Sequence, residues 1–299
     1  MEKSEKKKNI LSIGEILWDS FPKGLFLGGA PFNVACHLNM LGENCTMISR
    51  IGNDSLGKQV LASLEQKNMS AEFIQIDSVY KTGLVNIYLD TNGNATYDIV
   101  EPAAWDFIEL NEKLVKIAEV SDILIFGSLA QRNSHTRSAI RSLKKIVPLT
   151  VFDINLRPPY DNPDIVKESL KQTTIVKLND TELMTLAKWF NLPSNLKSFA
   201  EALSNEFNCK IVCVTKGGNG AALWHSGTWS EHPGFKVKVK DTVGSGDAFL
   251  SALISGVAFG DFDSYEVLKK ANAVGAFVAS SDGATPLLSE DEINAVMKN

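Results

Sequence analysis

The chain has 299 residues, of which 44% are hydrophobic and 22% charged, and its formal net charge is −5. This length suits one large α/β domain or two small ones, with enough apolar residues to bury a sizeable core. The acidic balance argues against a general nucleic-acid-binding protein, which needs a basic surface, and no apolar run reaches the length of a membrane span.

A basic tail precedes the first apolar run, which predicts a strand at 9–14. This region carries Glu15 and Asp19 and has no small-residue cleavage site, so we do not expect a signal peptide. The four cysteines form no Cys-x-x-Cys pair and no zinc-site spacing. They indicate buried free thiols, and a cytoplasmic location is expected.

Short, nearly continuous apolar runs alternate with amphipathic stretches along the chain. The apolar runs predict buried strands at 9–14, 122–128, 149–155, 174–179 and 210–215. Helical patterns are found at 134–146, 180–190 and 198–207. This alternation predicts an α/β fold with a parallel sheet flanked by helices, whose site lies at the carboxyl ends of the strands.

Two glycine-containing stretches near the N-terminus could bind a ligand. In "GGAPFNVACHLNMLG", 28–42, small residues would let a ligand approach the backbone, and the Asn33 amide suits a hydroxyl group. An ordinary strand-to-helix loop explains this stretch equally well. The second stretch, 50–59, nearly matches a nucleotide-binding P-loop, but Gln59 replaces the required Ser or Thr and no strand is expected to lead into Gly52. We interpret it as a chance match.

A hairpin interrupts the α/β pattern at 83–101, where residues alternate around an Asn-Gly pair at 92–93. It could be a lid over a site or an edge extension without a role. Further along, Asp153, Asn155 and Arg157 occupy alternate positions, which predicts that they share one face of an extended segment. Such a set suits a phosphate or a polyol.

Three later stretches also carry candidate chemistry. Asn179 and Glu182 would meet at a helix start, where a capping box is an equally good interpretation. The stretch 214–221 predicts a hairpin with an accessible backbone. In "DTVGSGDAF", 241–249, two glycines precede an apolar helix, so amide groups and the helix dipole could bind a phosphoryl group beside Asp247. Asp247 could then act as a base, or it could simply cap the helix.

Taken together, these stretches resemble the ribokinase-like, or PfkB, family of carbohydrate kinases, and within it the bacterial fructokinases. The likeness covers roughly 10–290 and rests on 28–42 and 241–249 as the two signatures, with "GEILWD", "DINLRPPY", "KLNDTE" and "VTKGGNGA" in the family's order. It implies a single kinase domain at 9–298, with a mostly parallel central sheet flanked by helices. A small β-sheet lid would be formed mainly by about 14–25 and 82–105.

The resemblance also implies roles for individual residues. Asp247 would be the general base, Gly244, Ser245 and Gly246 the anion hole, and Arg157 a cation beside the transferring phosphate. The sugar would be bound by Asp19, Gly28, Gly29, Asn33, Tyr97, Ile99 and Trp105. The nucleotide side would include Asn179, Glu182, Thr215, Gly217, Gly220 and Asn272, with Mg²⁺ organised by the first two. A monovalent cation such as K⁺ would lie near Asp241, Val243, Ser281 and Gly283.

The implied activity is the ATP-dependent phosphorylation of a primary hydroxyl of a free sugar, with fructose as the expected substrate. Many ribokinases and phosphosugar kinases of this family carry a lysine after the Gly-Gly pair, whereas this chain has Ala30, which favours a neutral, unphosphorylated sugar. A kinase for 2-keto-3-deoxygluconate or ribose stays open as an alternative, as does a non-catalytic sugar or nucleotide sensor. Pairing of two copies through the lid occurs in the family, and the sequence leaves the oligomeric state open.

Overall fold

The computed structural model describes residues 7–22, 24–89, 95–258 and 261–298. The Asn-Gly pair predicted to form the hairpin turn lies outside these residues. A nine-stranded sheet forms the centre, in the order β13-β12-β11-β10-β9-β8-β1-β4-β5. Its strands are β1 (Asn9–Ile13), β4 (Asn44–Gly52), β5 (Ile74–Asp77), β8 (Ile123–Gly127), β9 (Leu149–Asp153), β10 (Ile175–Asn179), β11 (Ile211–Thr215), β12 (Ala221–His225) and β13 (Thr228–His232).

The strands from β5 to β11 run parallel to one another, and β12 and β13 add an antiparallel edge. The five strands predicted from apolar runs are all present, and the predicted hairpin after β11 is confirmed. The expectation that no strand leads into Gly52 was wrong, because β4 ends there. The Asp54 side chain caps the following helix by accepting from the Gly57 amide, so the P-loop-like stretch is an ordinary strand-to-helix turn.

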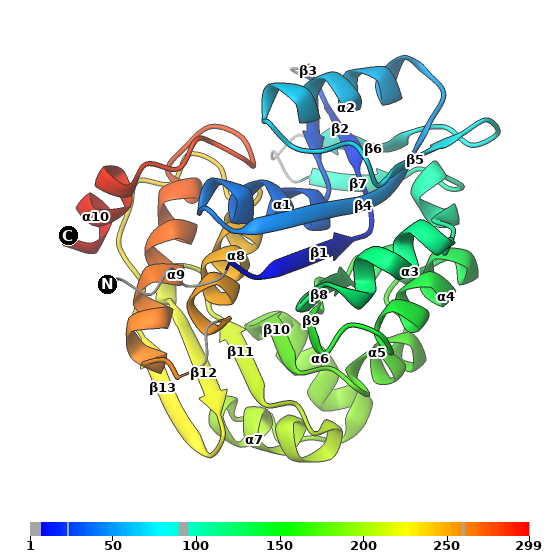
Figure 1. Ribbon diagram of the computed structural model, residues 1–299. Helices are drawn as coiled ribbons and strands as arrows, with labels where there is room; N and C mark the ends of the chain where they lie inside the picture. The colour runs from blue at the N-terminus through cyan, green and yellow to red at the C-terminus, as the bar shows by residue number, and fades with distance from the viewer. Residues whose placement is uncertain (1–6, 23, 90–94, 259–260, 299) are drawn as a thin grey trace, which may run out of the picture.

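Helices cover both faces of the large sheet (Figure 1). They are α1 (Ala30–Met40), α2 (Ser55–Gln66), α3 (Glu112–Glu119), α4 (Ser134–Leu143), α5 (Pro163–Leu170), α6 (Asp180–Phe190), α7 (Leu196–Phe207), α8 (Ser245–Val257), α9 (Ser264–Ala279) and α10 (Glu290–Lys298). The two faces of the sheet pack against different helices, as neighbouring residues of β1 show. Ile10 packs with α1 and α8, whereas Leu11 packs with the core under α3 to α7. Alternation along each strand therefore builds two apolar cores. No helix within the described residues is long and apolar enough to cross a membrane.

A small four-stranded sheet lies above one end of the large one (Figure 1). Its order is β3-β2-β6-β7, with bounds Gly24–Gly28, Leu17–Phe21, Gly83–Leu89 and Ala95–Ile99. One face buries Leu17, Val85 and Ile99 over Trp105. On the other face, Trp18 packs towards α2 and donates to the Leu56 carbonyl. Both predicted lid segments thus contribute strands to this sheet.

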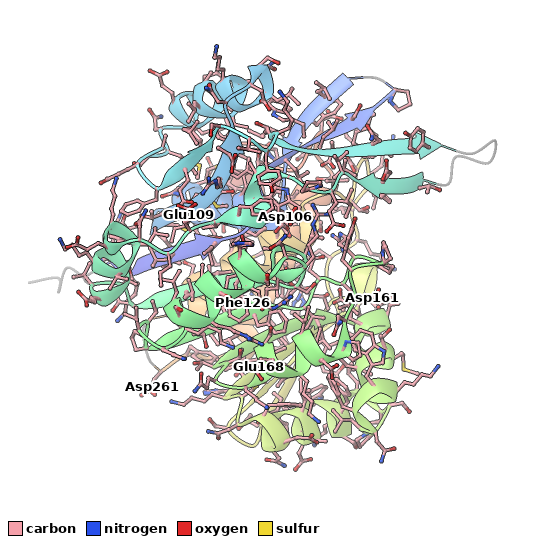
Figure 2. The ribbon with its side chains drawn as sticks, turned by 90° about the vertical axis from the view of Figure 1, so that its right-hand side faces the viewer. Asp106, Glu109, Phe126, Asp161, Glu168 and Asp261 are labelled. Carbon is pink, nitrogen blue, oxygen red and sulfur yellow. The ribbon has the colours of Figure 1, made fainter. Side chains whose placement is uncertain are left out.

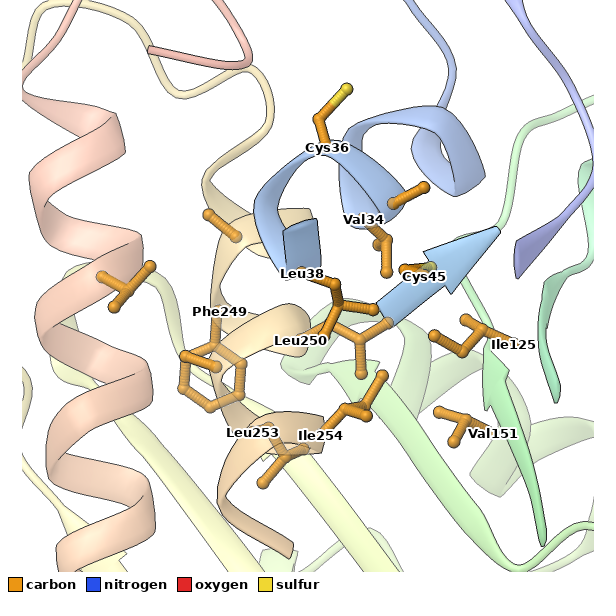
Figure 3. Packing of buried hydrophobic residues seen from close by; sticks show 14 of the residues in the cluster. Val34, Cys36, Leu38, Cys45, Ile125, Val151, Phe249, Leu250, Leu253 and Ile254 are labelled. Carbon is orange, nitrogen blue, oxygen red and sulfur yellow. The ribbon is translucent and has the colours of Figure 1, made fainter. Parts of the chain in front are cut away.

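Helix α8 is buried along nearly its whole length. Figure 3 shows Leu250 and Ile254 of α8 directed towards α1 and the large sheet. The Ser251 hydroxyl adds a polar link by donating to the Val34 carbonyl of α1 over 3.1 Å. This packing fixes the N-terminus of α8 against α1, which matters because both helices carry candidate site residues at that end.

Candidate active site

The turn before α8 forms a cradle of backbone amides. Gly244 has φ 78°, a left-handed conformation that favours glycine, and a Cβ there would overlap the Ala284 carbonyl. Ser245, Gly246 and Asp247 form the first turn of the helix, so their amides lack intrahelical partners. The Ser245 amide donates instead to the Thr242 carbonyl over 3.2 Å, which leaves the Gly246 and Asp247 amides for a ligand. The helix dipole adds positive potential at the same place. The turn can therefore bind an anion, mainly through the Gly246 and Asp247 amides.

Asp247 lies in that first turn and is 9% exposed. Its Oδ2 accepts a hydrogen bond of 2.8 Å from Nδ2 of Asn33, in α1. Burial, reinforced by the nearby Asp153, raises the pKa of Asp247 to about 6. A carboxyl group with this pKa is ionised at neutral pH, yet it accepts a proton more readily than an exposed aspartate does.

A buried ion pair lies behind the cradle. Lys177 of β10 and Asp153 of β9 are register partners on neighbouring strands, and Nζ of Lys177 is 3.0 Å from Oδ1 of Asp153. Burial alone would lower the pKa of Lys177, but Asp153, Glu182 and Asp247 raise it, so the ammonium group stays charged. A Cβ built on Gly246 would lie 3.4 Å from Nζ, which places this cation against the amide cradle.

The predicted arrangement of Asp153, Asn155 and Arg157 on one face was wrong. Strand β9 ends at Asp153, and Asn155 has φ 40°, so the chain turns out of the extended conformation. As a result Asp153 is buried whereas Arg157 is exposed. Arg157 nevertheless lies within electrostatic reach of Asp247, whose pKa it lowers.

Two further carboxyl groups come within reach of Arg157. Asp19, on β2, has its pKa raised to about 6 by burial, and the charge of Arg157 opposes this shift. Glu15, just after β1, has its pKa raised by burial to about 7, with Arg157 again lowering it and Asp247 raising it. A cluster of carboxyl groups with shifted pKa values around one cation is typical of a functional site.

The predicted sugar-binding residues are divided between this cluster and the small sheet. Gly28 lies so close to Asp19 that a Cβ there would be 2.8 Å from Oδ2, and Gly29 caps α1 beside Glu15. Tyr97 is exposed on β7, whereas Ile99 and Trp105 are buried in the core of the small sheet. A role for Trp105 in binding sugar would therefore be indirect.

A cavity of about 1170 Å³ opens between the small sheet and the loops near the ends of α8 and α9. Asp19, Phe26 and Tyr97 line it from the small sheet, and Asp241 and Gly283 line it from the loops. This volume is sufficient for a small-molecule ligand. Asp247 and Arg157 do not line the cavity, so Asp19 connects it to the carboxyl cluster.

The Asn179 and Glu182 pair forms the capping box of α6. The Asn179 side chain accepts from the Glu182 amide, and the two Glu182 oxygens accept from the Asn179 and Leu156 amides, all over 2.8 Å. Each carboxylate oxygen retains a second lone pair, which could accept a hydrogen bond from a water ligand of a metal ion. Within the described residues, no three acidic, cysteine or histidine side chains gather closely enough to hold a metal ion.

The remaining predicted positions lie on β11 and the turn after it, on α9, and on the loops beside the cradle. Thr215 ends β11, and Gly217 and Gly220 form the turn into β12. Asn272 is buried in α9 and donates to the Leu268 carbonyl of its own helix. The Asp241 backbone amide donates to the Ala279 carbonyl, so the loop holding Asp241 and Val243 lies beside the C-terminal end of α9 and the turn with Ser281 and Gly283.

Sequence reasoning missed three residues with unusual environments. The sequence signal for Lys177 is a charged residue inside an apolar predicted strand, and that for Glu15 is an acid just after one, but neither signal identifies the partners of these residues. Arg132 is held by both oxygens of Asp106 at 2.8 Å, and Trp105 lies under its guanidinium group. Figure 2 labels Asp106 just below the strands of the small sheet. No pattern in the sequence connects Arg132 with Asp106, which are 26 residues apart.

Comparisons with known proteins agree with this arrangement. Residues 24–291 match the model of the pfkB family of carbohydrate kinases. The chain is 30% identical to fructokinase-2 of Zea mays, over 93% of this chain and 90% of that protein. It superposes with a TM-score of 0.81 on an uncharacterized sugar kinase of Pyrococcus horikoshii in complex with ATP, at 27% identity and covering 96% and 99% of the two chains. A fructokinase double mutant of Vibrio cholerae, bound to fructose, ADP and potassium ion, has the same fold at 23% identity, with a TM-score of 0.84 and 99% and 100% coverage.

Proposed function

The chain belongs to the pfkB family of carbohydrate kinases, and we propose that it transfers the γ-phosphoryl group of ATP to the primary hydroxyl at carbon 6 of fructose. The observation that carries the proposal is the buried Asp247 carboxylate beside a cradle of amides. In the proposed step the sugar oxygen attacks the γ-phosphorus, the bond to ADP breaks, and Asp247 takes the hydroxyl proton. Positioning and charge stabilisation supply most of the rate enhancement in this reaction class.

The assignment to a neutral sugar is supported by the residues around Asp19. Three carboxyl groups and the Asn33 amide offer acceptors for hydroxyl groups. Ala30 follows Gly29 where a lysine could have bound a charged substituent. Arg157 and Lys177, which both lower the pKa of Asp247, are cations suited to the phosphoryl group. Relatives named as fructokinases over most of the chain support fructose as the acceptor.

The phosphoryl donor is proposed to be MgATP. The complex of the Pyrococcus horikoshii kinase with ATP supports the nucleotide. The magnesium ion would be held mainly by the phosphates, with the free lone pairs of Glu182 able to accept from its water ligands. The loop of Asp241 and Val243 beside Gly283 is proposed to bind a potassium ion, as backbone and carboxylate oxygens there suit a hard cation.

We also propose that the small sheet acts as a lid and as a pairing surface. It carries exposed Leu25, Tyr88 and Tyr97, which two copies could bury against each other. The proposed setting is the cytoplasm, where ATP is supplied and where the four buried cysteines would stay reduced.

An assay of ADP release with a panel of sugars tests the proposed function. Fructose should give the highest kcat/KM, with ribose and 2-keto-3-deoxygluconate at least roughly tenfold lower, because a missing or added polar group leaves buried partners unpaired. Product analysis should find the phosphate on carbon 6. A higher kcat/KM for either other sugar would assign the enzyme to that substrate, and no sugar-dependent ADP release at all would support a sensor.

Activity should fall on the acidic side of neutrality. Asp247 must be ionised to accept a proton, and its pKa is about 6, so protonation removes the base as the pH drops through that value. Asp19 and Glu15, with pKa values of about 6 and about 7, take up protons in the same range. We therefore expect kcat/KM for fructose to fall more than about tenfold per pH unit below pH 6. A flat profile from pH 5 to 8 would contradict the role given to Asp247.

A further inference from the structure

Glu15 has a buried carboxyl group, and one of its oxygens lacks a partner among the residues that the structure describes. It follows Gly14 at the carboxyl end of β1, the edge of the large sheet where the site residues gather, and it is 3% exposed. Among the described residues, no hydrogen-bond donor reaches its Oε2. Leaving a buried carboxyl oxygen unpaired costs free energy, so such a group calls for an explanation.

The surroundings of Glu15 belong to the sugar side of the site. Gly29, the cap of α1, fits against its carbonyl oxygen and Cγ, and a Cβ at position 29 would overlap the carbonyl. Three charged residues from other elements lie within electrostatic reach, namely Arg157 after β9, Asp247 of α8 and Arg132 after η2 (Leu129–Gln131). Glu15 therefore lies between the two signature stretches of the chain.

A second acceptor atom in the same region is also without a partner. Asn33 uses Nδ2 to donate to Asp247, and no donor in the described part of the chain reaches its buried Oδ1. Two buried acceptors without donors are suited to a ligand that supplies hydroxyl hydrogens. A sugar does this, whereas a nucleotide phosphate at neutral pH offers only acceptors.

We propose that Glu15 binds the sugar, with Oε2 accepting a hydrogen bond from a hydroxyl group of fructose other than the one that is phosphorylated. This inference rests on the proposed function. The unpaired oxygen is then a stability cost retained for binding, as is common at functional sites.

The first test is substitution of Glu15 by Met, which has a similar length but no strong acceptor. Calorimetric titration of fructose without nucleotide should show roughly 10- to 100-fold weaker binding, as expected for loss of a bond to a charged acceptor. KM for fructose should rise by a similar factor, and KM for ATP should change by less than about twofold. Glu65→Met, at an exposed position of α2, is the matched control and should bind fructose normally.

Thermal unfolding separates this role from a structural one. Because Glu15→Met removes a buried carboxyl group with one unpaired oxygen, its Tm should equal or exceed that of the unsubstituted protein. A lower Tm with unchanged fructose affinity would mean that Glu15 supports the fold and does not bind sugar, and this outcome would overturn the proposal.

Fructose analogues that lack the hydroxyl at carbon 1, 2, 3 or 4 identify the partner of Glu15. One of them should bind weakly to the unsubstituted protein but lose little further affinity in Glu15→Met, because both changes remove the same hydrogen bond. Additive losses for all four analogues would overturn the proposal while leaving the fructokinase assignment intact. If the unsubstituted protein phosphorylates no fructose, the proposed function fails first, and that result is seen before any variant is made.

Discussion

Asp247→Asn should lower kcat for fructose phosphorylation by about 10²–10⁴-fold, the range typical of removing a positioned general base. An asparagine has nearly the same shape, so the contact with Asn33 and the start of α8 should persist. It cannot take the hydroxyl proton, however, and the attacking oxygen must then lose that proton to water. KM for fructose should change much less than kcat, and the acidic limb of the kcat profile should disappear. Steady-state ADP release over a range of fructose concentrations and pH values measures all three.

This prediction separates catalysis from helix capping. Asp164 occupies the first turn of α5 as Asp247 does in α8, but it is exposed. Asp164→Asn is therefore a matched control that changes only the interaction with a helix dipole, worth about 0.3–1 kcal/mol. If Asp247→Asn retained near-normal turnover, the carboxylate would be a cap, and the general base would have to be sought elsewhere.

Much of the fold could be predicted because buried parallel strands are short, apolar and separated by amphipathic helices. The runs at 122–128 and 210–215 became β8 and β11 with bounds shifted by one residue. The glycines of 241–249 likewise indicated a turn into a helix, since Gly244 needs a left-handed φ that few other residues adopt. These features depend on local sequence, which is why periodicity and turn chemistry found them.

The contacts that tune the site could not be predicted in this way, because they join strands far apart in the chain. Lys177 meets Asp153 only once the register of β9 and β10 is known. Alternation along 153–157 predicted that Asp153 and Arg157 lie on one face. Strand β9 ends at Asp153 instead, and the left-handed conformation of Asn155 directs the chain so that Arg157 is exposed. Similarly, Glu15 looks like a solvated acid until the packing of Gly29 shows that it is buried.

Lys177→Met should destabilise the protein by about 3–5 kcal/mol, the usual effect of breaking a buried ion pair by removing one partner. Lys177 lies among three buried carboxyl groups, those of Asp153, Glu182 and Asp247, and none of the described residues donates to Oδ2 of Asp153. Without the ammonium group, Asp153 is left as an uncompensated buried charge. Urea unfolding should show a lower midpoint with an unchanged slope. Lys188→Met, exposed on α6, should leave the midpoint unchanged.

The same substitution should also change the chemistry, because Nζ lies against Gly246 of the amide cradle. Loss of this cation should lower kcat by roughly 10²-fold, as for removal of one group that stabilises the transition-state charge. It should also raise the pKa of Asp247, since Lys177 lowers that pKa, and so move the acidic limb of the kcat profile to higher pH. Adding Asp153→Leu should recover part of the lost stability by removing the unpaired charge, but not the lost turnover. If the double variant regained full activity, the pair would serve only the fold.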